Sequence, residues 1–495
     1  MMKSTKSVEE MFYIKLLAPL AFAFLIYLIP TPEGLSPNAW LYLSIFVGLI
    51  VGLILEPIAP ALIGVIAVTI AVLFKVGPVG SGNVETIIKD SVAIKWGLAG
   101  FSDSVVWLIF AAFTIGLGFS KTGLGERIAL YLVSKLGKST LGLGYAIAIV
   151  DLILAPFIPS NAARSGGTVY PIVNSIAPMF ESYADKNPRK IGAYLIWVGL
   201  ASCCVSSSIF LTGQAPNPLA LSLINQNGVA VVDWLSWFLA FLPVGLILFI
   251  ITPLLGFFIY PPEIRGSKEI ALWAEEKYKA LGKMPRSQIF MLIIAFIGLV
   301  LWVGASFFKI NATTTALLMI ILMIACKVIS WQDFLSNKPA WNTLVWFATL
   351  VTMAGGLKNV GFLDFLANAL GSKLTGFTPF IAMILLLMLF SWLRYFFASG
   401  TAYVTAIIAI FVSLASSIEG ANPALIMLIL VLPMGFMGVI TPYGTGCSPL
   451  WFGSNYIKGP QFFLLGGIFA AIYMGIYLFV GIPWVEFIMP YLTFH

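Results

Sequence analysis

The sequence predicts an all-α polytopic membrane protein, and three observations support this fold class. Hydrophobic residues make up 60% of the 495 residues and charged residues only 9%, whereas soluble domains carry about 25% charged residues. Apolar stretches long enough to cross a bilayer recur along the whole chain. No short segments alternate between apolar and polar residues, as the strands of a membrane β-barrel do. A soluble multidomain protein is therefore excluded.

Charge-free apolar stretches predict about eleven transmembrane helices. Long stretches lie near 16–30, 39–55, 57–74, 141–150, 191–232, 235–262, 288–308, 312–326, 422–457 and 461–485, and shorter ones flank polar interruptions at 104–120, 152–180, 342–357 and 377–418. The first stretch lacks a small-residue cleavage site and is expected to remain as a span. Residues 82–103 are amphipathic and bounded by glycines, so they lie either along the membrane interface or in a solvated loop.

The charge distribution indicates a lipid bilayer rather than a nucleic-acid partner. The net charge is +7, but the 27 basic residues are few for this length and gather in short loops, as the positive-inside rule predicts. No basic patch typical of nucleic-acid binding is visible. The largest polar loop, 261–287, is rich in Lys and Arg. We therefore expect a multi-pass protein of the cell (inner or plasma) membrane with this loop and the N-terminus in the cytoplasm and the C-terminus outside.

Several chemistries find no support in the sequence. The only histidine is His495, so a histidine-built metal site or proton relay is excluded. The four cysteines lie in apolar or Gly/Pro-rich stretches and imply no disulfide framework. There is no phosphate-binding loop of a nucleotide-driven pump, no paired acids or nucleophile–base set of a membrane enzyme, and no charged ring of a channel. We expect neither a metal ion nor a cofactor.

The chain repeats itself. Residues 106–118 resemble 345–357 at an offset of 239 residues, the same offset relates a serine in each polar-interrupted span, and a later threonine recurs at an offset of 229. Landmarks in the same order predict a duplication. An odd number of spans in each repeat would invert the second repeat relative to the first, an arrangement common in secondary transporters. The matched pairs are Trp107 and Trp346, Gly116 and Gly355, Ser160 and Ser399, and Thr212 and Thr441.

One span in each repeat is predicted to break within the membrane. Pro156 and Pro159 prevent continuous helical hydrogen bonding before Ser160, and the second break falls at 399–401. Unwound backbone at membrane depth is tolerated where protein or a water-filled cavity satisfies it. Each break also leaves a half-helix N-terminus with partial positive charge, which suits a carboxylate. A matched pair of breaks therefore predicts an anion site near the midplane; the alternative is two kinks that serve only packing.

Two arginines lie close to these breaks. Arg394 is the only charge between Lys373 and Glu419, and Arg164 follows Ser160 by four residues. A charge within the membrane is costly and suggests function, and an arginine can hold a carboxylate through two parallel hydrogen bonds. The alternatives are a side chain that reaches the interface or, for Arg164, a partner for Asp151, which is itself expected to be structural. Thr212-Gly213-Gln214 and Thr441-Pro442-Tyr443 mark a second break in each half and fit either ligand binding or turn chemistry.

Four motifs resemble those of a known family. FIPSNAARSGGTVYPI, LTGQAPNPLA, RYFFASGTAYVTA and TPYGTGCSPLWFGSNYI are similar to motifs of the divalent anion:sodium symporter family, and most like its exchanger branch of citrate/succinate antiporters and 2-oxoglutarate/malate translocators. The resemblance implies eleven spans plus two re-entrant hairpins, a homodimer, and an elevator-type transport domain that slides against a scaffold. The implied segments are scaffold helices and an amphipathic arm over 1–102, the first half of the transport domain over 103–232 (hairpin 103–138, breaks near 160 and 212), further scaffold helices over 233–340, and the second half of the transport domain over 341–495 (hairpin 341–375, breaks near 399 and 441).

The resemblance also bears on the coupling ion. The family motif is Ser-Asn-Thr at each break, where it holds substrate carboxylates, and each copy in this chain lacks one member. In sodium-coupled members a hydroxyl four residues before the motif serine helps to bind sodium, and those positions are Pro156 and Tyr395 here. Pro156 has no side-chain oxygen, so the resemblance favours exchange without sodium. The two copies are Ser160-Asn161-Ala162 and Ser399-Gly400-Thr401.

The expected function is therefore secondary active transport rather than enzymatic catalysis. We expect sodium-independent exchange of C4–C5 dicarboxylates (succinate, malate, fumarate, 2-oxoglutarate) or citrate-like anions, and the alternative is a sodium- or proton-coupled symporter of the same small molecules. The residues expected to bind substrate are Ser160, Asn161, Ala162, Arg164, Thr212, Gly213, Arg394, Ser399, Gly400, Thr401, Thr441 and Pro442.

Overall fold

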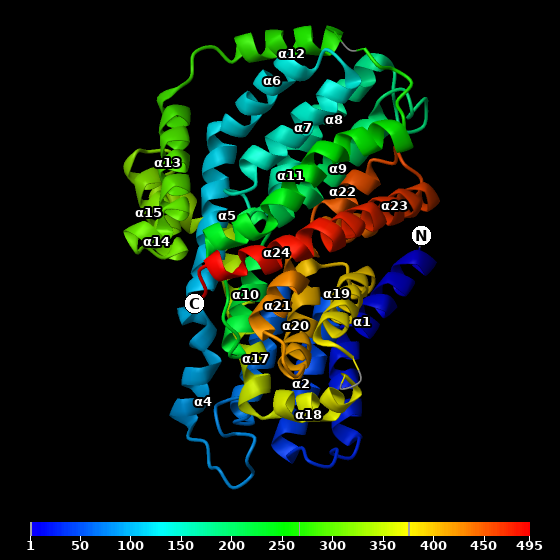
Figure 1. Ribbon diagram of the computed structural model, residues 1–495. Coiled ribbons are helices and arrows are strands. Elements are labelled where there is room, and N and C mark those ends of the chain that lie inside the picture. Colours follow the sequence, from blue (N-terminus) through cyan, green and yellow to red (C-terminus); the bar gives the residue numbers. More distant parts are fainter. Residues whose placement is uncertain (1, 267, 375–376) are drawn as a thin grey trace.

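The computed structural model describes residues 2–266, 268–374 and 377–495 (Figure 1), so the predicted boundaries at residues 1 and 375 lie outside the described residues. Within this part of the chain every regular element is a helix, and extended residues pair only in isolated bridges. Eight of its helices are long and apolar enough to cross a membrane, and six further apolar helices are shorter. The all-α membrane fold class is thus present, whereas the count of eleven spans remains a prediction.

The helices occupy three consecutive stretches of the chain, 2–226, 234–335 and 338–488, and Figure 1 colours them in chain order from blue to red. The first contains α1 (Met2–Leu28), α2 (Pro37–Leu55), α3 (Pro60–Leu73), α4 (Asp90–Gly97), α5 (Ser104–Thr122), α6 (Leu124–Leu136), α7 (Thr140–Leu154), α8 (Tyr170–Ile176), α9 (Gly192–Ile209) and α10 (Pro216–Gln226). The second contains α11 (Trp234–Ile259), α12 (Lys268–Ala280), α13 (Arg286–Val303), α14 (Ala305–Phe308), α15 (Ala312–Ala325) and α16 (Trp331–Leu335). The third contains α17 (Lys338–Asn359), α18 (Phe362–Leu374), α19 (Pro379–Leu393), α20 (Gly400–Ser416), α21 (Pro423–Val431), α22 (Ser448–Gly453), α23 (Gly459–Ile476) and α24 (Ile482–Ile488).

Helix α9 lies at the centre of the larger of two hydrophobic cores. Every one of its 18 residues is buried, as expected for a helix that is apolar on all sides. Helices α7 and α11 pack directly against it. The smaller core joins α2 and α3 to α17 and α18. The predicted scaffold segment 1–102 therefore packs mainly on elements of the second half of the chain.

The two halves also exchange packing partners. Helix α5 of the first half packs on α15, and α17 of the second half packs on α3. Both contacts depend on a glycine that lets the helices approach closely, because a side chain at Gly118 would overlap Met323 and one at Gly64 would overlap Thr349. This reciprocal packing supports the predicted duplication; the inverted relation of the repeats remains a prediction.

Each predicted hairpin is a pair of helices joined by a glycine with positive φ. Gly123 (φ 67°) links α5 to α6, and Gly361 (φ 79°) lies between α17 and α18. In Figure 1, α6 bends away from α5 rather than folding back along it. It packs against α7 and α12, while α18 packs on α20. The two helices expected in each hairpin are thus present. The second helix of each hairpin, α6 or α18, packs mainly against helices outside the hairpin.

The polar segments lie at opposite ends of the molecule. The basic loop contains α12, which lies across one end, whereas α4, within the amphipathic stretch 82–103, lies near the other (Figure 1). Arg127 of α6 fastens the loop by donating hydrogen bonds to the carbonyls of Leu281 and Gly282. The orientation of these ends in a membrane remains a prediction.

Candidate functional site

Both interrupted spans are broken at the predicted places. Helix α7 ends at Leu154, the chain is irregular as far as Ser160, and a π-helical segment continues from Ala162 to Val169. Helix α19 ends at Leu393, followed by a single 3₁₀ turn and then by α20. π-helical geometry is rare and often accompanies functional sites. At each break the chain folds back on itself, because residues before the break contact residues well after it: Asp151 contacts Arg164 at the first break, and Phe390 contacts Phe411 at the second.

The two breaks meet at one cavity of about 300 Å³. It is lined by all three members of each predicted motif and by Arg394, although these residues lie more than 200 positions apart in the sequence. The residues that line the cavity from the two predicted motifs are Ser160, Asn161, Ala162, Ser399, Gly400 and Thr401. The structure thus brings together the two breaks that the sequence analysis matched by their offset; the role of these residues as substrate ligands remains a prediction.

Each break presents the start of a half-helix to the cavity. The Ser399 hydroxyl caps α20 by accepting a hydrogen bond from the backbone N–H of Ala402 (3.4 Å). The Ser160 hydroxyl accepts one from the backbone N–H of Ala163 (3.2 Å). N-terminal backbone groups of a helix carry partial positive charge. Both ends are therefore suited to an anion.

Arg394 is a buried cation without a counter-ion among the described residues. Its side chain is 1% exposed and lines the cavity. Nη2 donates a hydrogen bond to the Gly444 carbonyl, but Nε and Nη1 have no hydrogen-bond partner in the described chain. The guanidinium carbon lies 5.4 Å from the centroid of the Tyr403 ring. An unpaired buried charge is costly, so these two N–H groups are the strongest indication of an anion ligand.

Arg164 has the opposite environment. It does not line the cavity, and its Nε donates to the Asp151 carboxylate at 3.1 Å. The remaining N–H groups also find acceptors, which are the carbonyls of Ile158, Gly213 and Cys203 and the hydroxyls of Ser206 and Ser207. Of the roles that the sequence left open for Arg164, the structure shows that of an ion-pair partner for Asp151. Arg164 therefore ties the first break to α9 and to the turn at Gly213.

The serines of α9 are part of this network. They are the three adjacent serines 206–208. Ser206 donates to the Asp151 carboxylate, Ser207 donates to the Asn161 side-chain oxygen (3.2 Å), and the Ser208 hydroxyl accepts from the backbone N–H of Phe436 (3.0 Å). In a buried helix such hydroxyls position neighbouring polar groups.

The four residues predicted at the second break of each half do not line the cavity. The Thr212 hydroxyl donates to the Pro156 carbonyl (2.7 Å) and accepts from Trp234, so it closes the turn. Gly213 accepts from Arg164, while Thr441 and Pro442 are buried. Residues a few positions later line it instead, and they are Gln214, Ala215, Pro216, Thr445, Gly446 and Pro449. The predicted positions lie within a few residues of those that line the cavity. The spacing of motifs along the sequence does not determine the direction that the chain takes at each turn.

Seven further lining residues are not among the ligands predicted from the sequence. Trp346 is one of the repeat landmarks, and its buried indole N–H has no partner among the described residues. Glu56 stands alone between two apolar stretches, and this isolation is the signal that could have found it. Pro159 is predicted only as part of the first break, and the remaining four have no signal in the sequence. The seven residues are Glu56, Phe113, Pro159, Thr343, Trp346, Phe347 and Ala398.

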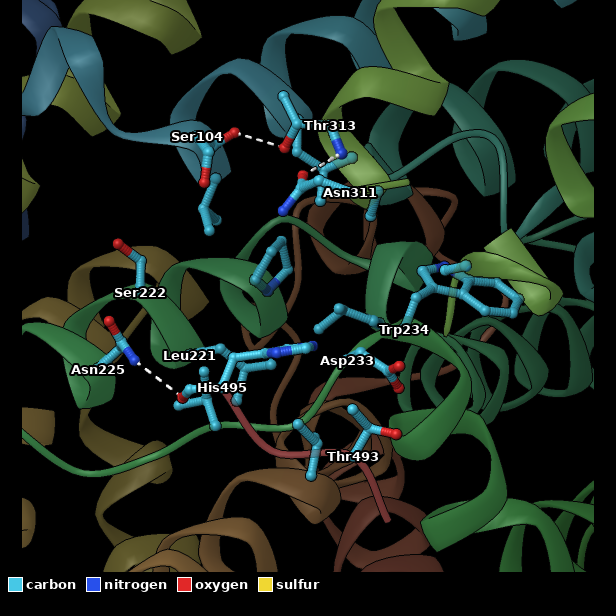
Figure 2. Close-up of a pocket in the computed structure, with 18 of the residues that line it drawn as sticks. Ser104, Leu221, Ser222, Asn225, Asp233, Trp234, Asn311, Thr313, Thr493 and His495 are labelled. Atoms are coloured by element: carbon cyan, nitrogen blue, oxygen red, sulfur yellow. Dashed lines mark hydrogen bonds between the residues drawn. The ribbon is translucent and has the colours of Figure 1, made fainter. Parts of the chain in front are cut away.

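A larger cavity of about 620 Å³ lies where α5, α10, α11 and the C-terminal segment meet. Figure 2 shows Thr313 bonded to Ser104 and Asn225 bonded to the His495 carbonyl across its walls. The carboxylate of Asp103 caps the start of α5, and that of Asp233 caps the start of α11. None of the predicted site residues lines this cavity. The smaller cavity is therefore the candidate site.

The comparison with known proteins decides the family. Residues 10–490 match the family model described as the sodium:sulfate symporter transmembrane region. This chain belongs to that family, the divalent anion:sodium symporters. It is 44% identical over 479 residues to the citrate/succinate antiporter of Escherichia coli, covering 95% of this chain and 97% of that protein. It is 38% identical over 480 residues to the L-tartrate/succinate antiporter of Shigella sonnei, covering 96% of this chain and 98% of that protein.

The fold of this symporter-family member also has a solved counterpart. The YdaH transporter of Alcanivorax borkumensis, whose structure is described as having an unusual topology, superposes with a TM-score of 0.56. The match covers 86% of this chain and 98% of that one at 10% sequence identity, so it concerns the fold alone. With transporters as relatives, the broken helices and their buried arginines belong to a multi-pass membrane transporter.

Proposed function

We propose that this protein is a sodium-independent antiporter that exchanges C4–C5 dicarboxylates or citrate-like anions across the cell membrane. The observation that carries the proposal is Arg394, whose Nε and Nη1 have no partner in the described chain and which lines a cavity between two half-helix starts. The names of the relatives, antiporters of citrate, tartrate and succinate, agree with an anionic substrate that carries two or more carboxylates.

The cavity offers different chemistry to the two ends of a short diacid. At the second break, Arg394 supplies a formal charge and Thr401 a hydroxyl beside the start of α20. At the first break, Ser160 and Asn161 supply only neutral groups and the start of the π-helical segment. A charge-assisted hydrogen bond is shorter and stronger than a neutral one. One carboxylate is therefore held mainly by charge, and the other end by neutral donors.

Resident arginines support exchange without sodium. A sodium site needs an oxygen cage, but the carbonyls near the first break already accept other donors: Gly213 accepts from Arg164, and Pro156 accepts from Thr212. At the second break, the Gly444 carbonyl accepts from Arg394. The positive charge that a cotransported ion would bring is thus part of the protein. A carrier without substrate retains an unneutralised Arg394, which is costly to move through a low-dielectric barrier.

The mechanical proposal follows the family resemblance. We propose that the broken helices and α9 move as one body against the scaffold segments in an elevator motion, and that the working unit is a homodimer with one cavity per protomer. The packing of α7 and α8 on α9 supports a moving body that contains α9 and the first break, and the contact of α9 with α11 is then part of the surface against which that body moves.

Counterflow in proteoliposomes tests this function. Purified protein is reconstituted with internal unlabelled succinate, and uptake of labelled succinate, citrate or tartrate is followed with and without a sodium gradient and with a protonophore. We expect rapid uptake only into loaded vesicles, unaffected by sodium or protonophore. Uptake into vesicles without internal substrate, driven by sodium or protons at a rate similar to exchange, would instead establish the symporter.

A further inference from the structure

Trp346 carries a buried indole N–H that has no hydrogen-bond partner within the described residues. The residue lines the 300 Å³ cavity together with Arg394. An indole N–H can only donate, and a buried donor without an acceptor costs free energy unless a ligand or a water molecule supplies one. The cavity that Trp346 lines is the place from which such an acceptor can come.

Other buried tryptophans differ from Trp346 in this respect. Trp107, its counterpart 239 residues earlier, donates its indole N–H to the Phe101 carbonyl at 2.8 Å and does not line the cavity. Trp197 of α9 also has no partner in the described chain, but it is fully buried against two phenylalanine rings and does not line the cavity either. Among the described residues, Trp346 alone combines a buried unpartnered indole N–H with a position at the cavity.

Two further residues of α17 line the cavity on the same side as Trp346. Thr343 precedes it by three positions and Phe347 follows it directly, so the three share one face of the helix. The Thr343 hydroxyl donates to the Pro339 carbonyl at 2.7 Å, which leaves its oxygen as an acceptor. Helix α17 thus offers the cavity a neutral donor and a neutral acceptor one turn apart.

Helix α17 lies beside both breaks. It packs on α10 and on α20, whose first residues, Pro216 and Gly400, also line the cavity. In the proposed binding mode the breaks and Arg394 take the two carboxylates of a short diacid. The carbon atoms between these carboxylates are then left for α17, and there succinate has only hydrogens whereas malate has a hydroxyl. A hydroxyl both donates and accepts, but an ionised carboxylate only accepts, so a hydroxyl matches the donor and acceptor of α17.

We propose that Trp346 is a specificity-determining residue that recognises the hydroxyl group of 2-hydroxy dicarboxylates. This inference rests on the proposed antiport function and refines its substrate class. The indole N–H donates to the substrate hydroxyl, and that hydroxyl donates to the Thr343 oxygen. A diacid without a hydroxyl leaves the N–H to a water molecule in the cavity, so it binds more weakly but is still exchanged.

The test compares Trp346→Phe with Trp107→Phe. Phenylalanine keeps an aromatic ring and removes the N–H. Trp107→Phe is the matched control, because it removes an N–H that already bonds to the backbone and does not line the cavity. Each variant is reconstituted in proteoliposomes, and exchange of labelled succinate is competed with unlabelled succinate, malate or methylsuccinate. Methylsuccinate has a methyl group where malate has its hydroxyl, so it controls for size.

The expected result is a loss of selectivity. In the wild-type protein, malate should compete at a concentration about threefold to tenfold lower than methylsuccinate, which is the range of one neutral hydrogen bond. Trp346→Phe should abolish this preference and leave competition by unlabelled succinate unchanged, whereas Trp107→Phe should keep the preference. Thr343→Val, which removes the acceptor, should also reduce it, and this variant carries the test if Trp346→Phe does not fold.

The role of Trp346 is overturned if the wild-type protein does not distinguish malate from methylsuccinate, or if the preference survives in Trp346→Phe. It is also overturned if Trp346→Phe weakens succinate as much as malate, because the N–H would then serve a carboxylate. The antiport function stands in all three cases. If the wild-type protein exchanges none of these anions, the antiport function fails instead, and the thermal shifts that malate and methylsuccinate produce in detergent then test hydroxyl recognition separately.

Discussion

Replacing Arg394 by alanine separates binding from folding more sharply than any other change at the site. Within the described residues the guanidinium makes a single hydrogen bond, to the Gly444 carbonyl, and no ion pair. Losing one such charged hydrogen bond costs about 1.5–3 kcal/mol, and removing a buried charge without a partner offsets part of this cost. We therefore expect Arg394→Ala to fold, with a melting temperature close to that of the wild-type protein.

Substrate binding should respond much more strongly. A hydrogen bond to a charged group contributes about 1.5–3 kcal/mol, and each 1.4 kcal/mol corresponds to a tenfold change in affinity. Arg394→Ala should therefore raise the KM for succinate exchange by about tenfold to a hundredfold. Arg394→Lys should recover only part of this loss, since a point charge does not reproduce the planar fork of a guanidinium.

The assay is exchange in proteoliposomes over a range of succinate concentrations, combined with the thermal shift that succinate produces in detergent. Wild-type protein and both variants are compared at equal amounts of reconstituted protein. If Arg394→Ala exchanges succinate with wild-type KM and rate, Arg394 does not bind the substrate and the two unpartnered N–H groups have another explanation.

Two further predictions use the same assays. Arg164→Ala should destabilise the protein by about 3–5 kcal/mol, because it leaves Asp151 as an uncompensated buried charge; a melting temperature equal to that of Arg394→Ala would contradict the structural role, and the double variant Arg164→Met/Asp151→Leu should recover much of the loss. Gly400→Ala should raise KM severalfold with little effect on stability, because its Cβ would lie 2.9 Å from Nη1 of Arg394 and so displace the guanidinium. Gly467→Ala, where nothing lies within 4 Å of the added atom, is the control; an equal KM in both variants would refute the argument.

The fold class and the breaks could be predicted because they depend on local properties of the chain. Hydropathy marks helices that face lipid, and Pro156 with Pro159 forces the first interruption wherever the span lies. The pairing of the helices could not be predicted in this way. Whether α6 folds back along α5 or packs on α7 depends on the backbone at Gly123 and on tertiary contacts, and the sequence contains both possibilities.

For the candidate site, too, one part could be predicted from the sequence and another part could not. The offset of 239 residues correctly related the two motifs that now share a cavity, because duplicated segments occupy related positions. The directions in which the two arginine side chains point could not be inferred from the sequence. Arg164 and Arg394 lie at comparable distances from their serines, but one guanidinium contacts Asp151 and the other lines the cavity. Glu56 lies outside both repeated motifs, so no argument from repetition could reach it.

The two arginines differ in a way that bears on the substrate. Each donates a hydrogen bond to a carbonyl at the second break of its own half, Arg164 to Gly213 and Arg394 to Gly444, so the two halves place a fixed cation at related positions. Only the first cation is neutralised by a carboxylate within the described chain. The cavity thus contains one available positive charge, which in the proposed binding mode takes one substrate carboxylate. In that mode the far end of the substrate meets the neutral groups of Ser160 and Asn161, and hydrogen bonds to neutral groups discriminate less strongly between carboxylate and hydroxyl. A site built in this way tolerates variation at one end of the substrate, and exchange between two different di- or tricarboxylates requires that tolerance.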